Sequence, residues 1–173
     1  MLKAMKEQLK ELSLDKQGQF HLILRERVGK RATEILETRL KRAIVLMPDL
    51  IALLYGYWEK DNASSTTKKL GSYLLTYLYV PKDYLSEKDW GLFGYLDDAY
   101  FVAKMYTTVI QDIQVSGAKL RSADLKLFEE VLSLKKDVRI AILKESKQID
   151  QLIDDLLDGK QESYTSLVSQ SEY

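Results

Sequence analysis

Apolar side chains recur at helical spacing along most of the chain, and this periodicity restricts the fold more than any other feature. Leu2, Met5, Leu9 and Leu12 show it at the N-terminus, and similar stripes follow further along. A stripe of this kind must be buried against another element. Only two prolines and eight glycines interrupt the 173 residues, which disfavours a fold of short strands and tight turns. We therefore predict an all-α helical bundle.

The order of the predicted helices can be read from the pattern and its breaks. Residues 13–30 fit a helix better than an isolated strand, because no second strand lies nearby to pair with. Proline suits the first helical position, so we expect Pro48 to begin a new helix. The last pattern is either one long helix or a hairpin bent near residues 133–136. The predicted helices cover residues 2–12, 13–30, 31–46, 48–58, about 67–80, 94–115 and 122–157.

Length, charge and cysteine content restrict the class of protein. The chain is long enough for one domain with a real core, which we place at residues 1–158, followed by a flexible polar tail at 159–173. Equal numbers of acidic and basic residues argue against a nucleic-acid partner,. The absence of cysteine excludes disulfides and cysteine-ligated zinc,. The apolar segment 43–58 is too short to span a membrane. We expect a cytoplasmic protein.

An acidic pair lies at the start of the helix that begins near Gly94, within the octet FGYLDDAY. Negative charge in the first turn of a helix is stabilised by about 0.3–1 kcal/mol. We expect Asp98 to be partly buried, because Phe101 follows on its side of the helix. Asp97 should lie nearer Lys104 and be exposed. The pair is thus predicted to hold the helix start against the preceding loop.

The same acidic region offers a weaker alternative, a divalent metal site. Asp83, Glu87 and Asp98 could supply the oxygen ligands that Mg²⁺ or Ca²⁺ prefers. Their spacing is not that of a calcium-binding loop, so we assign no metal, no cofactor and no catalytic residue. The binding or structural candidates are Asp83, Glu87, Tyr95, Asp97 and Asp98.

One pattern within residues 47–106 is formed by Pro81, Asp83, Gly94, Tyr95, Leu96, Asp97 and Asp98. This pattern resembles the YkvA-like family, a small helical domain of unknown function. The resemblance implies a helical core over about residues 47–115, with helical extensions at both ends, and implies no known catalytic activity. Ser86 replaces the second proline of the family pattern, and Glu87 stands for the acid that follows it.

The C-terminal stripe needs a partner that the sequence does not identify. An isolated helix is marginal in water, so its apolar side chains must be buried. The N-terminal helix is too short to cover them all, and we therefore predict an interface with a second copy or another protein. The interface candidates are Ile142, Ile149, Leu152, Ile153 and Leu156.

Two other features bear on function. His21 is the only histidine, and no nucleophile or zinc motif accompanies it. Basic residues outnumber acidic ones between Arg25 and Arg42. Such residues usually form a solvated face, and they could also guide the protein electrostatically toward another molecule.

The C-terminal apolar stripe and the lack of a catalytic motif in the sequence together favour a non-catalytic protein–protein interaction module or a subunit of a larger assembly. The alternatives are a divalent-metal-dependent hydrolase that uses the acidic cluster and a peripheral membrane adaptor that uses residues 43–58.

Overall fold

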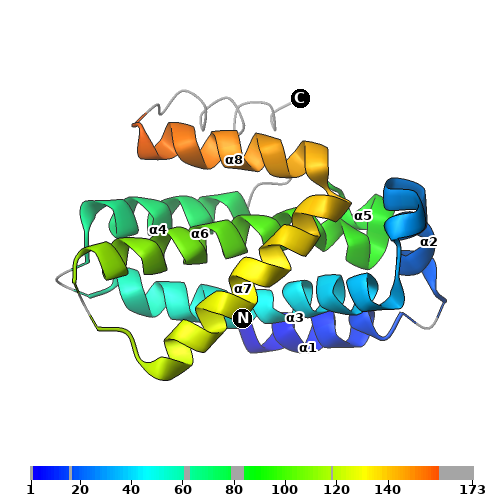
Figure 1. Ribbon diagram of the computed structural model, residues 1–173, viewed down its shortest axis with the longest axis horizontal. Helices are drawn as coiled ribbons and strands as arrows, with labels where there is room; N and C mark the ends of the chain where they lie inside the picture. Colours follow the sequence, from blue (N-terminus) through cyan, green and yellow to red (C-terminus); the bar gives the residue numbers. More distant parts are fainter. Residues whose placement is uncertain (1, 16, 61–62, 79–83, 118, 160–173) are drawn as a thin grey trace.

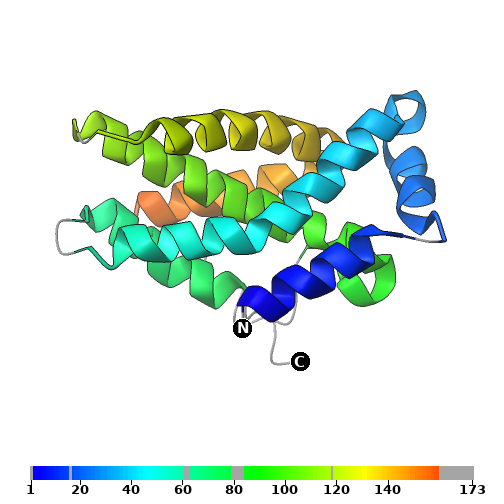
Figure 2. The ribbon, with the colours of Figure 1, turned by 90° about the horizontal axis from the view of Figure 1, so that it is seen from below.

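The structure is a computed structural model that describes residues 2–15, 17–60, 63–78, 84–117 and 119–159. Within these ranges the regular elements are all helices, which confirms the all-α prediction (Figures 1 and 2). The predicted tail lies outside the described residues from 160 onward. The elements are α1 (Leu2–Ser13), α2 (Gln19–Val28), the 3-10 helix η1 (Gly29–Arg31), α3 (Glu34–Trp58), α4 (Ser65–Leu78), α5 (Glu87–Trp90), the 3-10 helix η2 (Gly91–Tyr95), α6 (Leu96–Val115), α7 (Ser122–Ala141) and α8 (Leu143–Leu157).

Helix α6 is the centre of the bundle. It packs against α3, α4, α7 and α8, and Figure 1 shows α4 and α3 running beside it while α7 crosses the bundle at an angle. Tyr100, Phe101 and Tyr106 are at most 1% exposed. Burial on several sides explains why α6 carries apolar residues around much of its circumference rather than along one narrow stripe.

The predicted break at Pro48 is wrong. Helix α3 runs without interruption from Glu34 to Trp58, with Pro48 buried inside it. Proline removes one intrahelical hydrogen bond and clashes with the preceding turn. Apolar residues before and after it, such as Ile44 and Ile51, are nevertheless buried in the same core. We infer that this continuous burial outweighs the local cost of the proline.

Helix α2 confirms the helical reading of residues 13–30 over Gln19–Val28. Phe20, Leu22 and Leu24 alternate with polar or other residues as in a strand, but Leu22 is 60% exposed while the other two are buried, as in a helix. The carboxylate of Asp15 accepts hydrogen bonds from the backbone N–H groups of Gln19 and Phe20, at 3.2 and 3.0 Å. These bonds satisfy donors at the start of the helix.

The last pattern is divided into two helices, and the bend lies later than predicted. It falls at Ile142, between α7 and α8, rather than at residues 133–136. Ile142 has φ −128° and ψ 52°, outside the helical region, and its side chain is completely buried. No glycine or proline marks this position. The bend therefore rests on tertiary packing, which periodicity alone does not reveal.

No helix of the described residues combines the length and apolar content needed to cross a membrane. The segment 43–58 forms the second half of α3, and most of its apolar side chains are buried in the core, among them Met47, Leu50 and Leu54.

Candidate functional site

The acidic octet is a packed joint between residues 84–95 and the start of α6. Asp97 is completely buried, and its Oδ2 accepts a hydrogen bond from the backbone N–H of Leu85 at 3.0 Å. A Cβ atom on Gly94 would lie 2.6 Å from the Cα of Glu87. Glycine is therefore needed for this close backbone approach. Asp97 thus holds this segment against α6, as the sequence predicts for the acidic pair, and Gly94 allows the close approach.

The predicted exposure of the acidic pair is correct for Asp98 and wrong for Asp97. Asp98 is 7% exposed and Asp97 is 0% exposed. Lys104, which we expected near Asp97, instead lies 3.3 Å from Asp150. The physical reason is that the segment before α6 folds back over the first turn. It covers the side of the helix that periodicity alone would leave in solvent.

The other candidates of this region lie close by in the fold. Glu87 begins α5 and Tyr95 is the last residue of η2, and both are partly buried. Asp83 falls outside the described residues, so the structure does not place it. Among the side chains that are placed, no group of three histidine or acidic residues is arranged to hold a metal ion. The two placed members of the metal alternative, Glu87 and Asp98, do not form such a site on their own.

The apolar stripe of α8 faces the interior, so the predicted interface with a second chain is wrong. Its residues contact the rest of the bundle, and α8 packs on α6 and α4 (Figure 1). Two helices distant in sequence provide the cover that the N-terminal helix could not. The exposed fractions are 0% for Ile142, Ile149 and Ile153, 4% for Leu152 and 2% for Leu156.

His21 takes part in a small surface network. Its Nδ1 lies 2.8 Å from Oε2 of Glu37, and the Lys41 amine lies 2.7 Å from Oε1 of the same carboxylate. Burial acts to raise the pKa of Glu37, but hydrogen bonds from Lys41 and His21 outweigh it and lower that pKa. An ionised Glu37 between two donors is an ordinary ion-pair arrangement, and it gives the histidine a structural partner.

A groove lies at the corner where the end of α2 meets the bend between α7 and α8. It encloses about 350 Å³. Ile140 and Leu143 remain 42% and 53% exposed on its walls. Arg31 and Lys144 also line it, and neither forms an ion pair with a residue that the structure describes. The corner groove is lined by Arg27, Val28, Arg31, Ile140, Ala141, Leu143, Lys144 and Glu145.

Glu145 gives the corner groove an unsatisfied acceptor. The residue is 8% exposed, and its Oε1 accepts a hydrogen bond from Nη1 of Arg27 at 2.8 Å. Its Oε2 is buried and has no hydrogen-bond partner among the described residues. Leaving a buried acceptor unpaired costs free energy. The groove thus combines free cations, exposed apolar side chains and a carboxylate oxygen that still needs a donor.

Sequence reasoning did not find this groove. Arg27 and Glu145 are 118 residues apart, so no local motif connects them. One signal was present: the excess of basic residues after Arg25, of which Arg31 lines the groove without an acidic partner. The sequence did not indicate the apolar side of the groove. The apolar residues predicted to form an interface are buried, while Ile140 and Leu143, which line the groove, were not among them.

Comparisons of the chain with protein-family models, curated proteins and solved structures found no match. The resemblance to the YkvA-like family therefore stays a prediction.

Proposed function

We propose that the protein is a non-catalytic interaction module that binds an acidic, partly apolar segment of a partner protein. The corner groove carries this proposal. Exposed Ile140 and Leu143 offer contact to apolar side chains, while Arg31 and Lys144 offer unpaired positive charge to carboxylates. Complementary charge of this kind guides association and selects among partners.

The buried oxygen of Glu145 adds a directional requirement. An N–H group of the bound segment would supply the donor that Oε2 lacks. Hydrogen bonds to charged groups are stronger than those between neutral groups. A volume of about 350 Å³ suits a few side chains of a peptide rather than a whole globular surface,. The proposed partner is therefore a short segment with carboxylates beside apolar residues.

Two observations favour this proposal over the alternatives. The carboxylate of Asp97 holds the backbone of Leu85, which favours a structural use of this acid. The segment 43–58 keeps Met47 and Leu50 in the core, so the face that a membrane adaptor would need is not presented. The predicted interface residues of α8 are likewise buried in the core, so they present no apolar face for self-association.

Selection from a library of short displayed peptides tests the proposal. The wild-type protein should select peptides that combine acidic with apolar residues. The double variant Arg31→Glu/Lys144→Glu should bind these peptides about tenfold or more weakly, because favourable charge contacts become repulsive. Fluorescence anisotropy with labelled peptides gives the affinities.

A matched control separates the groove from the overall charge of the protein. Lys3 and Lys10 are exposed on α1 and form no ion pair with the described part of the chain. The variant Lys3→Glu/Lys10→Glu changes the net charge equally and should bind the selected peptides like the wild type. Equal losses in both double variants, or selected peptides without acidic residues, would contradict the proposed groove.

A further inference from the structure

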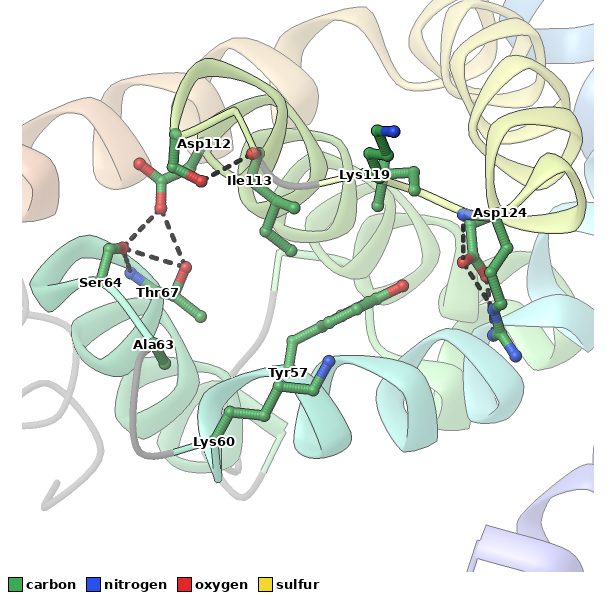
Figure 3. A pocket seen from close by; sticks show the side chains of 12 residues that line it. Tyr57, Lys60, Ala63, Ser64, Thr67, Asp112, Ile113, Lys119 and Asp124 are labelled. Carbon is green, nitrogen blue, oxygen red and sulfur yellow. Dashed lines mark hydrogen bonds and ion pairs between the residues drawn. The ribbon is translucent and has the colours of Figure 1, made fainter.

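A second and larger cleft lies at the other end of the bundle. The last turn of α3, the first turns of α4 and α7 and the last turn of α6 enclose about 510 Å³ there (Figure 3). This volume falls in the usual range for small-molecule sites. The positive ends of two long helices, α4 and α7, contribute to its walls,. This end cleft is independent of the corner groove.

Both carboxylates of the end cleft already have protein donors. Asp112 accepts hydrogen bonds from the hydroxyl groups of Ser64 and Thr67, the latter at 3.1 Å. Asp124 is bound by two nitrogen atoms of Arg121, at 2.9 and 3.0 Å. Hydrogen bonds from Arg121 hold the pKa of Asp124 below its usual range, against the opposing effect of burial. The negative charges are therefore engaged in local structure.

The positive and phenolic groups of the end cleft are not engaged in this way. Lys60 and Lys119 form no ion pair with residues in the described ranges, and the Tyr57 hydroxyl makes no hydrogen bond to them. Figure 3 shows the Tyr57 side chain extending across the cleft toward Asp124. The Lys60 amine lies 5.0 Å from the centre of the Tyr57 ring. These groups can all donate hydrogen bonds to an incoming molecule.

A buried phenol adds an independent observation. Tyr106 is 0% exposed, and its hydroxyl has no hydrogen-bond partner within the described structure. Tyr106 does not itself line the cleft, but it lies two turns before Ile113, which does, on the same side of α6,. Burial first, and then the nearby Tyr57 and Asp124, raise the pKa of Tyr106. Its hydroxyl thus stays protonated at neutral pH and is a donor without an acceptor.

We propose that the end cleft binds a small organic anion, a carboxylate or a phosphate ester with a compact apolar body. The anionic group would meet the amines of Lys60 and Lys119 and the hydroxyl of Tyr57. Ile113 and Leu120 provide apolar contact for the rest of the molecule. A ligand oxygen at the inner end of the cleft would give the Tyr106 hydroxyl the acceptor that it lacks. Charge-assisted hydrogen bonds of this kind are the stronger ones in proteins.

Nuclear magnetic resonance titrations with three probes of similar size test the charge requirement. Benzoate and phenyl phosphate should shift the backbone amide signals of Ser64, Thr67 and Ile113, and benzylamine should not. Preference between the two anions identifies the anionic group. Equal binding of benzylamine, or no shift with either anion at millimolar concentration, would overturn the proposal.

Substitutions locate the anion. The variant Lys60→Met/Lys119→Met should weaken binding of the better anion about tenfold or more. The control Lys3→Met/Lys10→Met removes the same charge from exposed positions on α1 and should leave the affinity unchanged. An equal loss in the control would show that only diffuse charge attracts the anion, which contradicts a site.

Tyr106→Phe distinguishes a ligand-binding role from a structural one. Because the hydroxyl has no protein partner to lose, the unliganded variant should be at least as stable as the wild type, while anion affinity falls by about threefold to tenfold. Tyr100→Phe is the matched control. The Tyr100 hydroxyl donates a hydrogen bond of 3.0 Å to Asp150, and neither residue lines the cleft. This control should lose stability and keep its affinity. Unchanged affinity in Tyr106→Phe would contradict a direct contact with Tyr106.

Discussion

Asp97 and Glu145 are both buried carboxylates in the first turn of a helix, yet their surroundings differ. Asp97 at the start of α6 accepts a hydrogen bond from a backbone N–H only 12 residues earlier. Glu145 at the start of α8 instead accepts its hydrogen bond from the side chain of an arginine 118 residues away. Burial and helix position alone therefore do not distinguish a structural acid from one suited to bind a ligand. Their hydrogen-bond partners do.

The largest expected effect comes from removing the structural acid. Asp97→Ala should lower the free energy of unfolding by about 3 kcal/mol, because the buried N–H of Leu85 loses its acceptor. Urea unfolding measures the change. Asp89 is exposed on α5, and Asp89→Ala should cost less than about 0.5 kcal/mol. Similar losses in the two variants would show that Asp97 does not hold the joint.

The next effect concerns the glycine of the same joint. Gly94→Ala should cost about 2 kcal/mol, since the new Cβ would lie 2.6 Å from the Cα of Glu87 and the backbone must shift,. Gly56 provides the matched control within α3, because nothing lies within 4 Å of its added Cβ. Gly56→Ala should stabilise the protein by up to about 1 kcal/mol. Thermal unfolding compares the two, and a stable Gly94→Ala variant would mean that the joint is loosely packed.

A smaller effect is expected for the acid of the corner groove. Glu145→Gln should change the free energy of unfolding by less than about 1 kcal/mol, because Arg27 keeps some solvent contact and the amide oxygen can still accept its hydrogen bond,. The same variant should bind the selected acidic peptides more weakly if their N–H groups need the carboxylate. Urea unfolding and anisotropy give both quantities. A stability loss as large as that of Asp97→Ala would remove the distinction between the two acids.

The last effect is a change of slope with pH at a partly buried cation. The Lys135 amine donates to the Thr107 hydroxyl at 3.0 Å, and burial followed by the charge of Lys104 lowers its pKa to about 8. Between about pH 8 and pH 10 the unfolded chain binds a proton that the folded protein does not. Wild-type stability relative to Lys135→Met should therefore rise with pH across this window. A flat difference in urea unfolding would show that Lys135 is well solvated.

The sequence was sufficient for the helices and insufficient for two of their breaks. Helical spacing placed α1, α4 and α6 within a few residues, because their apolar faces are regular. Pro48 and Ile142 were misjudged for opposite reasons. Proline usually begins a helix, but Pro48 lies inside α3 because the helix is buried on both sides of it. Isoleucine does not usually end a helix, but α7 ends before Ile142 because tertiary packing bends the chain there.

The candidate site was harder to predict than the fold. Asp97 and Asp98 were predicted to hold the start of α6 against the preceding loop, but the burial of Asp97 depends on a segment that folds back over α6. The α8 stripe was recognised as needing cover, but α4 and α6 as its partners follow only from the tertiary arrangement. The corner groove depends on Arg27 and Glu145 meeting across most of the chain, which no local pattern records.

Arg27 also touches an aromatic pair, and this gives the protein an optical reporter. Its guanidinium carbon lies 4.8 Å from the centre of the Trp90 ring and 5.8 Å from that of Phe93. A segment that draws Arg27 or Glu145 into new contacts would change the charge above the indole and with it the emission of Trp90. Trp58, the only other tryptophan, packs beside Gly71. Occupancy of the corner groove could thus be followed by intrinsic fluorescence, without attaching a dye.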